Sequence, residues 1–296
     1  MGNSIIQIIM QSCIFFPLVS AVSLSFNILK IPDLTVEGSF VIGAAVFARL
    51  LTENYDPFVG MAAACMAGAL AGTMTSFMHR CNVAPLISGV LAIFILSSAT
   101  LIVMGRPNIS ILGKDTIITI FQGFMPLQEK ASKTLFFIIV AATTMTFLSV
   151  MMSSRIGLFL RAFGDNKQFL LRIGKDAEMY RIIGLVISNA LAAMCGALTA
   201  QVNGYADSAM GLGVGLIGIG TVIIGNQLYG AAFGDEKKPH HVMLMFCFAG
   251  VVIYFTAMNF FIKLQLNPIY LKMIMGVTLA SFLMTAKPEK HMEGAL

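Results

Sequence analysis

The sequence contains no tryptophan, and only 11% of its 296 residues are charged. Soluble globular domains carry about 25% charged residues, whereas this chain is 57% hydrophobic and has a mean hydropathy of +0.86. A water-soluble core cannot absorb so much apolar sequence, so the lipid bilayer must be the solvent. We therefore expect an all-α polytopic membrane protein. Without tryptophan, any interfacial belt must rest on Tyr, Phe and Lys.

Motifs for catalysis and for cofactor binding are also missing. The sequence has no G-x-x-x-x-G-K-[ST] phosphate loop, no H-E-x-x-H and no nucleophile elbow, and its five cysteines show no CxxC spacing. "GVGLIG" (213–218) fits the dinucleotide pattern, but it lies in an apolar run, where glycine favours close helix packing. "GALAG" (68–72) has the same interpretation. We expect no catalytic residue, no metal site and no cofactor.

The four histidines and the net charge also have plain explanations. The histidines fall at predicted cytoplasmic ends of spans, where we expect solvated side chains: His79, His240, His241 and His291. The net charge of +5 comes from short basic clusters between apolar runs. This pattern is that of a membrane protein, so we expect no nucleic acid partner.

Nine apolar segments approach the roughly 20 residues that a membrane-spanning helix needs. They are 4–29, 38–51, 57–79, 85–104, 132–152, 181–201, 209–230, 241–262 and 268–286. The second reaches span length only if the stretch from Ile31 is counted with it. The start "MGNSIIQIIMQ" lacks the basic residues of a signal peptide, so we interpret it as a retained first span.

The orientation of the spans follows from the basic residues. The strongest basic cluster lies between 153 and 181, which the positive-inside rule places in the cytoplasm. Its members are Arg155, Arg161, Lys167, Arg172, Lys175 and Arg181. Counting spans outward places 79–82, 234–241 and the C-terminus inside, and 52–56, 105–131 and the N-terminus outside. The residues Arg106, Lys114 and Lys130 weaken this assignment for the outer loop.

Two segments resemble each other within the chain. "PDLTVEGSFVIGAAV" (32–46) and "ADSAMGLGVGLIGIG" (206–220) both place an Asp and a hydroxyl residue ahead of a Gly-rich, Ile-rich helix. By the predicted topology they run in opposite orientations. Inverted repeats with polar breaks in matching helices are typical of transporters. Chance similarity between two Gly-rich spans is the alternative.

The connection 153–181 is too polar to span a membrane and too patterned for a linker. "GDN" (164–166) predicts a turn and a helix N-cap. "KQFLLRIG" then predicts a short amphipathic helix that ends at Gly174, with Phe169, Leu170 and Ile173 on one side. Such a helix is suited to docking into a groove of a soluble partner. It is equally suited to lying on anionic lipid.

The stretch "RAFGDNKQFLLRIGKDAEMYRIIGLVISNALAAMCGALTAQ" (161–201) resembles the coupling loop and following helix of ATP-binding-cassette (ABC) importer permeases. These are relatives of the branched-chain amino-acid and ribose permeases. Within that superfamily the chain resembles the single-permease branch associated with tryptophan or tyrosine uptake. Four further segments fit this branch in family order, so the resemblance covers nearly the whole chain: 31–46, 104–113, 204–225 and 266–274.

This resemblance implies an inverted-repeat, type II-like importer permease that forms a single domain over 1–296. The vitamin B12-type importers and the ribose permeases have ten spans per subunit. Nine spans here would drop the first of these, so the inverted halves would be about 4–104 and 181–286, with the fifth span between them.

The resemblance also implies partners and a location. They are a second copy of the chain, two ATPase subunits that bind ATP, an extracytoplasmic binding protein that delivers a small solute such as an amino acid, and the bacterial plasma membrane. The segment 161–178 would receive the ATPase stroke. The resemblance assigns contact with the ATPase to six residues of this segment: Arg161, Phe163, Gly164, Asp165, Asn166 and Phe169.

Two sets of polar residues are candidates for the solute pathway. Asp33, Thr35 and Glu37 fall at the broken start of the second span, and their counterparts in the repeat are Asn203, Asp207 and Ser208. Ionisable groups at membrane depth are costly and usually face a cavity or a partner. We hypothesise that both sets line or gate the pathway. The alternative is structural, because Asp33 and Glu37 could cap the second helix.

Two other functions stay open. An ion-coupled secondary transporter that acts without an ATPase would use Asp33, Glu37 and Asp207 as coupling carboxylates. A membrane scaffold or receptor would transport nothing, and the broken, Gly-rich helices argue against it. A neighbouring or co-purifying ATPase would favour the importer.

Overall fold

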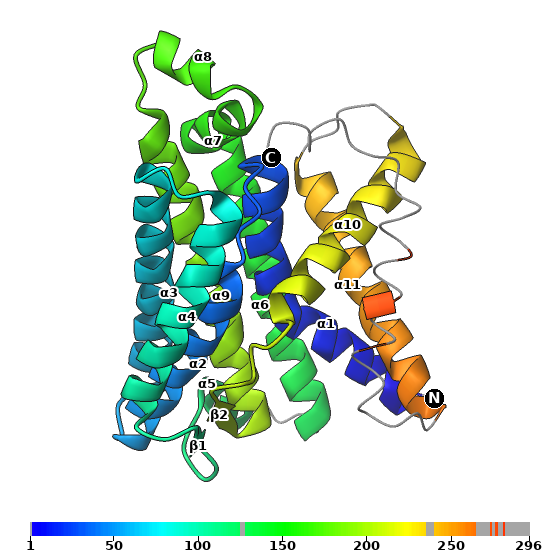
Figure 1. Ribbon diagram of the computed structural model, residues 1–296. Coiled ribbons are helices and arrows are strands. Elements are labelled where there is room, and N and C mark those ends of the chain that lie inside the picture. The colour runs from blue at the N-terminus through cyan, green and yellow to red at the C-terminus, as the bar shows by residue number, and fades with distance from the viewer. Residues whose placement is uncertain are drawn as a thin grey trace.

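The computed structural model describes residues 2–124, 128–234, 240–264, 273, 276–277 and 281 (Figure 1). Eight helices in this part are long and apolar enough to cross a membrane, and each overlaps a predicted span. They are α1 (Gly2–Ser23, continued by the π-helical turn η1, Leu24–Ile28), α2 (Thr35–Thr52), α3 (Pro57–Arg80), α4 (Pro85–Met104), α6 (Glu129–Ser153), α9 (Ala177–Asn203), α10 (Val214–Phe233) and α11 (His240–Lys263). The all-α polytopic fold is therefore confirmed. The ninth predicted span, 268–286, lies almost entirely outside the described residues.

Shorter elements occupy the two ends of the helix bundle. Helices α7 (Arg155–Asp165) and α8 (Lys167–Arg172) lie at one end, and the strands β1 (Asn108–Ser110) and β2 (Tyr205–Asp207) lie at the other (Figure 1). The two strands pair antiparallel, with Ile109 opposite Ala206. Helix α5 (Ile117–Phe124) lies near this ribbon.

Two predicted helix starts differ from the structure. Helix α2 begins at Thr35 and not at 38, so its 18 residues reach span length without the stretch from Ile31. Helix α10 begins at Val214 and not at 209, because Gly213 before it adopts a left-handed φ of 82°. The starts of α2 and α10 lie near each other in mid-bundle and the helices run toward opposite ends (Figure 1). An inverted repeat has this arrangement, while the boundaries of its halves remain a prediction.

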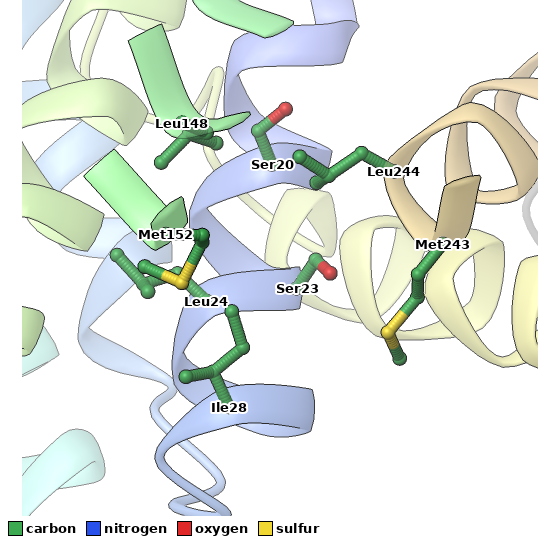
Figure 2. Close-up of a pocket in the computed structure, with 8 residues that line it drawn as sticks. All are labelled: Ser20, Ser23, Leu24, Ile28, Leu148, Met152, Met243 and Leu244. Atoms are coloured by element: carbon green, nitrogen blue, oxygen red, sulfur yellow. The ribbon is translucent and has the colours of Figure 1, made fainter. Parts of the chain in front are cut away.

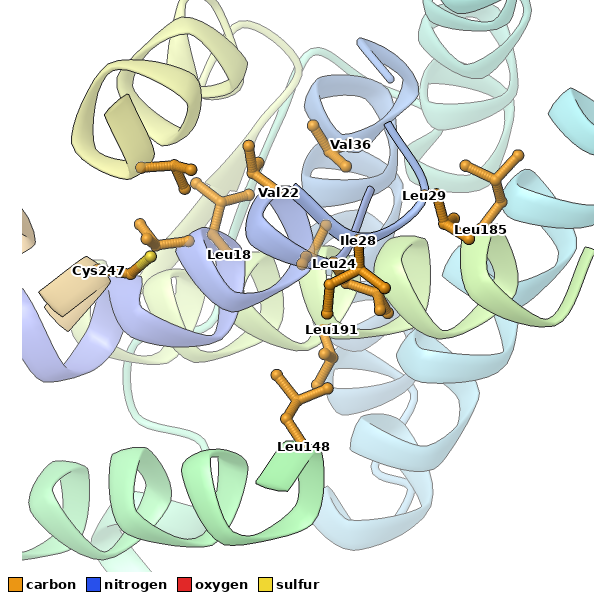
Figure 3. Packing of buried hydrophobic residues seen from close by; sticks show 14 of the residues in the cluster. Leu18, Val22, Leu24, Ile28, Leu29, Val36, Leu148, Leu185, Leu191 and Cys247 are labelled. Atoms are coloured by element: carbon orange, nitrogen blue, oxygen red, sulfur yellow. The ribbon is translucent and has the colours of Figure 1, made fainter. Parts of the chain in front are cut away.

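The main apolar core gathers around the second half of α1. Leu18, Val22 and Leu24 pack there with residues of α2, α6, α9 and α11 (Figure 3). Most of α2 and α9 is buried. In the outer helices only about a third of the span or less is buried: α3, α4, α6, α10 and α11. The apolar faces left exposed on these outer helices suit contact with lipid. Leu160, Phe163 and Leu170 of α7 and α8 belong to the same core, so these two helices are built into the bundle.

Small residues allow α3 to lie directly against α9. A Cβ atom on Gly68 would meet the backbone carbonyl of Asn189, and one on Gly72 would meet that of Leu185. Glycine spaced four residues apart lets two helix backbones approach closely. This confirms the packing interpretation of "GALAG".

The prediction that His79 is solvated is wrong. This side chain is only 7% exposed, and its Nε2 atom lies 2.5 Å from the Ser88 hydroxyl. The short turn between α3 and α4 folds the first turn of α4 back against the last turn of α3, which encloses the ring. His241 is exposed as expected, while the side chains of His240 and His291 lie outside the described residues.

Candidate functional site

The connection between η1 and α2, residues 29–34, is a non-helical break beside buried parts of the bundle. Asp33 in this break is 3% exposed. Its Oδ1 atom accepts a hydrogen bond from the Thr35 backbone N–H at 2.8 Å, which satisfies a free donor at the start of α2. Its Oδ2 atom accepts a bond from the Asn189 amide of α9 at 2.9 Å. Asp33 therefore supports the helix start and joins it to α9.

Further polar contacts complete this buried network. The Ser39 hydroxyl donates to Asn189 Oδ1 at 2.6 Å, and the Asn189 amide also donates to the Leu185 carbonyl. The hydroxyls of Thr35 and Thr75 lie 2.9 Å apart, which connects α2 to α3. The expected polar cluster at this break therefore exists and is internally hydrogen-bonded. A paired network of this kind specifies one arrangement of three helices.

Glu37 makes a different contact, toward α10. Its Oε1 atom accepts a hydrogen bond from the Gly213 backbone N–H at 3.0 Å. Gly211 and Gly215 lie against the same first turns of α2, where a Cβ atom would approach Val41 and the Glu37 carboxylate. The glycines of "GVGLIG" thus include one at a helix start and one packed against α2, which agrees with the packing interpretation.

The counterpart residues in the repeat lie elsewhere. Asn203 is exposed at the end of α9, Asp207 ends strand β2, and Ser208 follows it in a turn. Asp207 accepts a bond from the Asn108 side chain at 3.2 Å, and the Ser208 N–H donates to the Pro107 carbonyl. The ribbon packs against the far half of α2, so the structure does not bring these residues to Asp33 and Glu37. Gly213 is the residue of the repeat that meets Glu37.

The sequence reasoning missed several polar residues inside the spans. Asn189 is fully buried and links Asp33 to Ser39. Asn27 and Asn226 exchange two amide hydrogen bonds, of 3.2 and 2.8 Å, between η1 and α10. The sequence signal was an asparagine within an apolar helix. A polar side chain at membrane depth is costly without a hydrogen-bond partner, so each such residue indicates a partner elsewhere in the protein.

Three of the predicted coupling residues are turned into the protein. The Arg161 guanidinium donates to the carbonyls of Met152 and Gly157, both at 3.2 Å. Phe163 is 8% exposed and belongs to the main core. Gly164 lies against the carbonyl of Ile28, where no Cβ atom would fit. These residues fix α7 to the bundle.

The other three coupling residues are exposed at the α7–α8 corner. Asp165 ends α7 and forms an ion pair with Lys30 at 2.7 Å. Asn166 caps α8, since its side chain accepts the Phe169 N–H at 3.2 Å, which confirms the predicted cap. Gly174 follows α8 with a left-handed φ of 71°, as expected of a helix end.

The apolar residues of α8 do not share one face as predicted. Leu170 is fully buried, whereas Phe169 and Ile173 are 51% and 45% exposed. Successive helical residues point about 100° apart, so burying Leu170 turns Phe169 outward. Phe169 and Ile173, four residues apart, form an exposed apolar surface, and the basic Lys167 and Arg172 belong to the same short helix. Leu171 is exposed on the other side of the helix.

A small crevice opens between α1, α6 and α11 (Figure 2). Its lining is mostly apolar, with two serine hydroxyls: Ser20, Ser23, Leu24, Ile28, Leu148, Met152, Met243 and Leu244. Ser23 accepts a bond from the Asn27 amide. The crevice is too small for a solute of amino-acid size.

Comparison with known proteins extends this description. Residues 4–283 match the family described as branched-chain amino acid transport system / permease component. An uncharacterized protein of Rickettsia prowazekii is 40% identical over 97% of this chain and 99% of its own. The tyrosine transport system permease protein of Clostridioides difficile is 30% identical over 96% of this chain and 91% of its own.

A more distant relative is the D-allose transport system permease protein of Escherichia coli, which is 24% identical over 93% of this chain and 80% of its own. No solved structure matches the chain. The family match covers most of the sequence, and it agrees with the resemblance seen at the α7–α8 segment and with the multi-pass helical fold. The chain belongs to the family of permease components of branched-chain amino acid transport systems.

Proposed function

We propose that the chain is the membrane-spanning subunit of an ABC importer. It would work with a second copy of itself, two ATPase subunits that bind ATP, and an extracytoplasmic binding protein. The observation that carries the proposal is the surface formed by Phe169 and Ile173, which are four residues apart and lie on one side of the helix. Both side chains are exposed, Phe169 on α8 and Ile173 at its C-terminal cap, while Leu170 anchors the helix in the core. A short, firmly anchored helix of this kind suits a groove on a soluble partner.

The orientation follows from the same end of the molecule. The basic residues between 153 and 181 lie around α7 and α8, so the positive-inside rule supports a cytoplasmic location for this end. The β ribbon, the N-terminus and the extracytoplasmic binding protein would then be on the other side of a bacterial plasma membrane, and the C-terminus would be cytoplasmic.

The proposed substrate is a small solute, namely an amino acid, and an aromatic amino acid is the first choice. The support is the tyrosine transport permease, which is 30% identical over nearly the whole chain. The D-allose relative is more distant. Selectivity in binding-protein-dependent importers lies mostly in the separate binding protein, so uptake must be measured with that partner present.

The proposed pathway uses the polar residues at the two helix breaks. Asp33, Thr35 and Glu37 would act at the start of α2, whereas Asn203, Asp207 and Ser208 would act near the ribbon end. An ion-coupled secondary transporter remains the alternative, with Asp33, Glu37 and Asp207 as coupling carboxylates. The hydrogen bonds of Asp33 to Thr35 and Asn189 give its carboxylate a structural role in either case.

The test is purification of the tagged chain from mild-detergent extracts of native membranes, followed by mass spectrometry. We expect an ATPase to co-purify and to be lost in Phe169→Asp. Phe163 is unsuitable for this test because it lies in the core. Tyr55→Asp is the matched control, since Tyr55 is 54% exposed at the opposite end, compared with 51% for Phe169.

One outcome would contradict the importer, and another would contradict only the proposed role of α8. If the chain purified alone and transported L-tyrosine in liposomes without ATP, the secondary transporter would replace the importer. If Phe169→Asp kept its ATPase but bound anionic vesicles less well than the wild type, α8 would be a lipid-binding helix.

A further inference from the structure

The break between η1 and α2 is held from one side by α7. Gly164 lies against the carbonyl oxygen of Ile28, at the end of η1. Two residues later, Lys30 Nζ lies 2.7 Å from Asp165 Oδ1. α7 therefore contacts the start of the break through backbone packing and through an ion pair.

The other side of the break is fixed to α2 and α9. Asp33 bonds the Thr35 N–H and the Asn189 side chain. Only Ile31 and Pro32 separate Lys30 from Asp33. Proline fixes its own φ, and an extended residue spans at most about 3.5 Å. The connection from Lys30 to Asp33 is therefore too short and too restricted to absorb a movement at one end. A displacement of α7 is expected to move the start of α2.

Lys30 adds a second constraint to this short connection. Its φ is 56°, in the left-handed region that lysine rarely adopts. Residues held in sparsely populated backbone regions persist only where their surroundings fix them, and they cluster at switch regions. The Asp165 carboxylate is part of those surroundings.

The movement would then reach α10. Glu37 lies in the first turn of α2, and it bonds the Gly213 N–H at the start of α10. A shift of the α2 start therefore strains or breaks the contact between the two oppositely directed helices. Coupling of this type requires packed elements with two discrete arrangements.

We infer that Lys30 and Asp165 are positioning residues that transmit the displacement of α7 to the start of α2, and from there to the Glu37–Gly213 contact. The inference rests on the proposed importer function. It gives Asp165 a role within the permease, separate from contact with an ATPase. An exposed ion pair contributes little to stability, so the pair can be broken without unfolding the chain.

The experiment uses the permease co-purified with its ATPase, with exposed Cys81 changed to Ser and exposed Leu212 changed to Cys as a reporter beside Gly213. The rate of labelling by a charged maleimide is measured with and without ATP and vanadate. In this reporter protein we expect ATP to change the rate by about fivefold or more. Lys30→Glu should abolish the change, and Lys30→Glu combined with Asp165→Lys should restore it.

A second ion pair supplies the matched control. Glu129 and Lys133 are also 2.7 Å apart, with exposures of 74% and 37%, compared with 67% and 33% for Asp165 and Lys30. Glu129→Lys should keep the full response to ATP. The inference is overturned if Lys30→Glu, with its ATPase bound, responds like the unmodified reporter protein, or if the charge swap fails to restore the response. A reporter protein that never co-purifies with an ATPase would instead overturn the proposed function.

Discussion

Glu37 in the first turn of α2 accepts the backbone N–H of Gly213, the residue that precedes α10, at 3.0 Å. The N-terminus of a helix carries a partial positive charge from its unpaired N–H groups. One carboxylate therefore lies at the positive ends of two helices that run in opposite directions. This arrangement holds the two helix starts together.

Removing this carboxylate should loosen α10 from α2. We expect Glu37→Ala to lower the free energy of unfolding by about 1 kcal/mol, the lower end of the range for a group that loses a charged partner, because this bond is only part-buried. Glu37→Gln keeps a hydrogen-bond acceptor, so it should lower the free energy of unfolding by less. Thermal unfolding in detergent measures both. Glu53→Gln is the control, because Glu53 pairs only with exposed Arg49 at the other end of α2.

The same variants test the pathway hypothesis for Asp33 and Glu37. If these carboxylates line or gate the pathway, Asp33→Ala and Glu37→Ala should reduce L-tyrosine uptake per molecule of assembled transporter. Uptake is normalised to the amount of complex in proteoliposomes. Variants that lower only protein abundance, and leave uptake per molecule intact, would show that the two residues have a structural role alone.

The bond between Asp33 and Asn189 should appear as an interaction free energy. Residues in one hydrogen-bond network give double-mutant coupling of about 0.5 to 3 kcal/mol. We expect Asp33→Ala and Asn189→Ala to couple in this range when their unfolding is compared with that of the double variant. Asn259 bonds Gln11 in another part of the bundle, so Asp33→Ala combined with Asn259→Ala should be additive. Additive effects for the first pair would contradict the network.

Close packing of α3 on α9 gives a prediction for glycine. Gly72→Ala should destabilise the fold, since its Cβ atom would collide with the backbone carbonyl of Leu185. Among the described residues, Gly230 in α10 has no neighbour within 4 Å of an added Cβ atom. Gly230→Ala should therefore be neutral or stabilising, because alanine favours a helix by about 1 kcal/mol over glycine. Equal melting temperatures for the two variants would argue against this contact.

Glu178 connects α8 to α9, because its carboxylate pairs with both Lys167 and Arg181. The Arg181 side chain is only 9% exposed and also donates to the Ser76 carbonyl. Glu178→Gln would leave this guanidinium buried without a countercharge, which is costly. We expect a clearly lower melting temperature and faster proteolysis near α8. Glu129→Gln, in an exposed pair, should change neither.

The eight spans in the described residues were predictable because hydrophobic length alone identifies a membrane helix. The Asn166 cap was predictable because it depends on residues near in sequence. The spacing of Gly68 and Gly72 predicted close helix packing, but their partner α9 lies far along the chain and was not predicted. The exact starts of α2 and α10 were not predictable to within three to five residues. They depend on the hydrogen bond from the Thr35 N–H to the Asp33 side chain and on the left-handed backbone at Gly213.

The partners of the polar residues could not be read from the sequence. Asn189 lies 156 positions from Asp33, and Gly213 lies 176 from Glu37. In lipid both faces of a helix are apolar, so periodicity does not say which face meets protein. This is why the burial of Phe163 and the exposure of Phe169 were not distinguished, and why His79 was misplaced.

The β ribbon has a mechanical consequence. Strand β1 follows α4 and strand β2 follows α9. Their pairing therefore connects two parts of the chain that are about a hundred residues apart. If the helices rotate while the ribbon stays paired, the ribbon would lie near the axis of rotation. The largest displacements would then occur at the end of the bundle that carries α7 and α8.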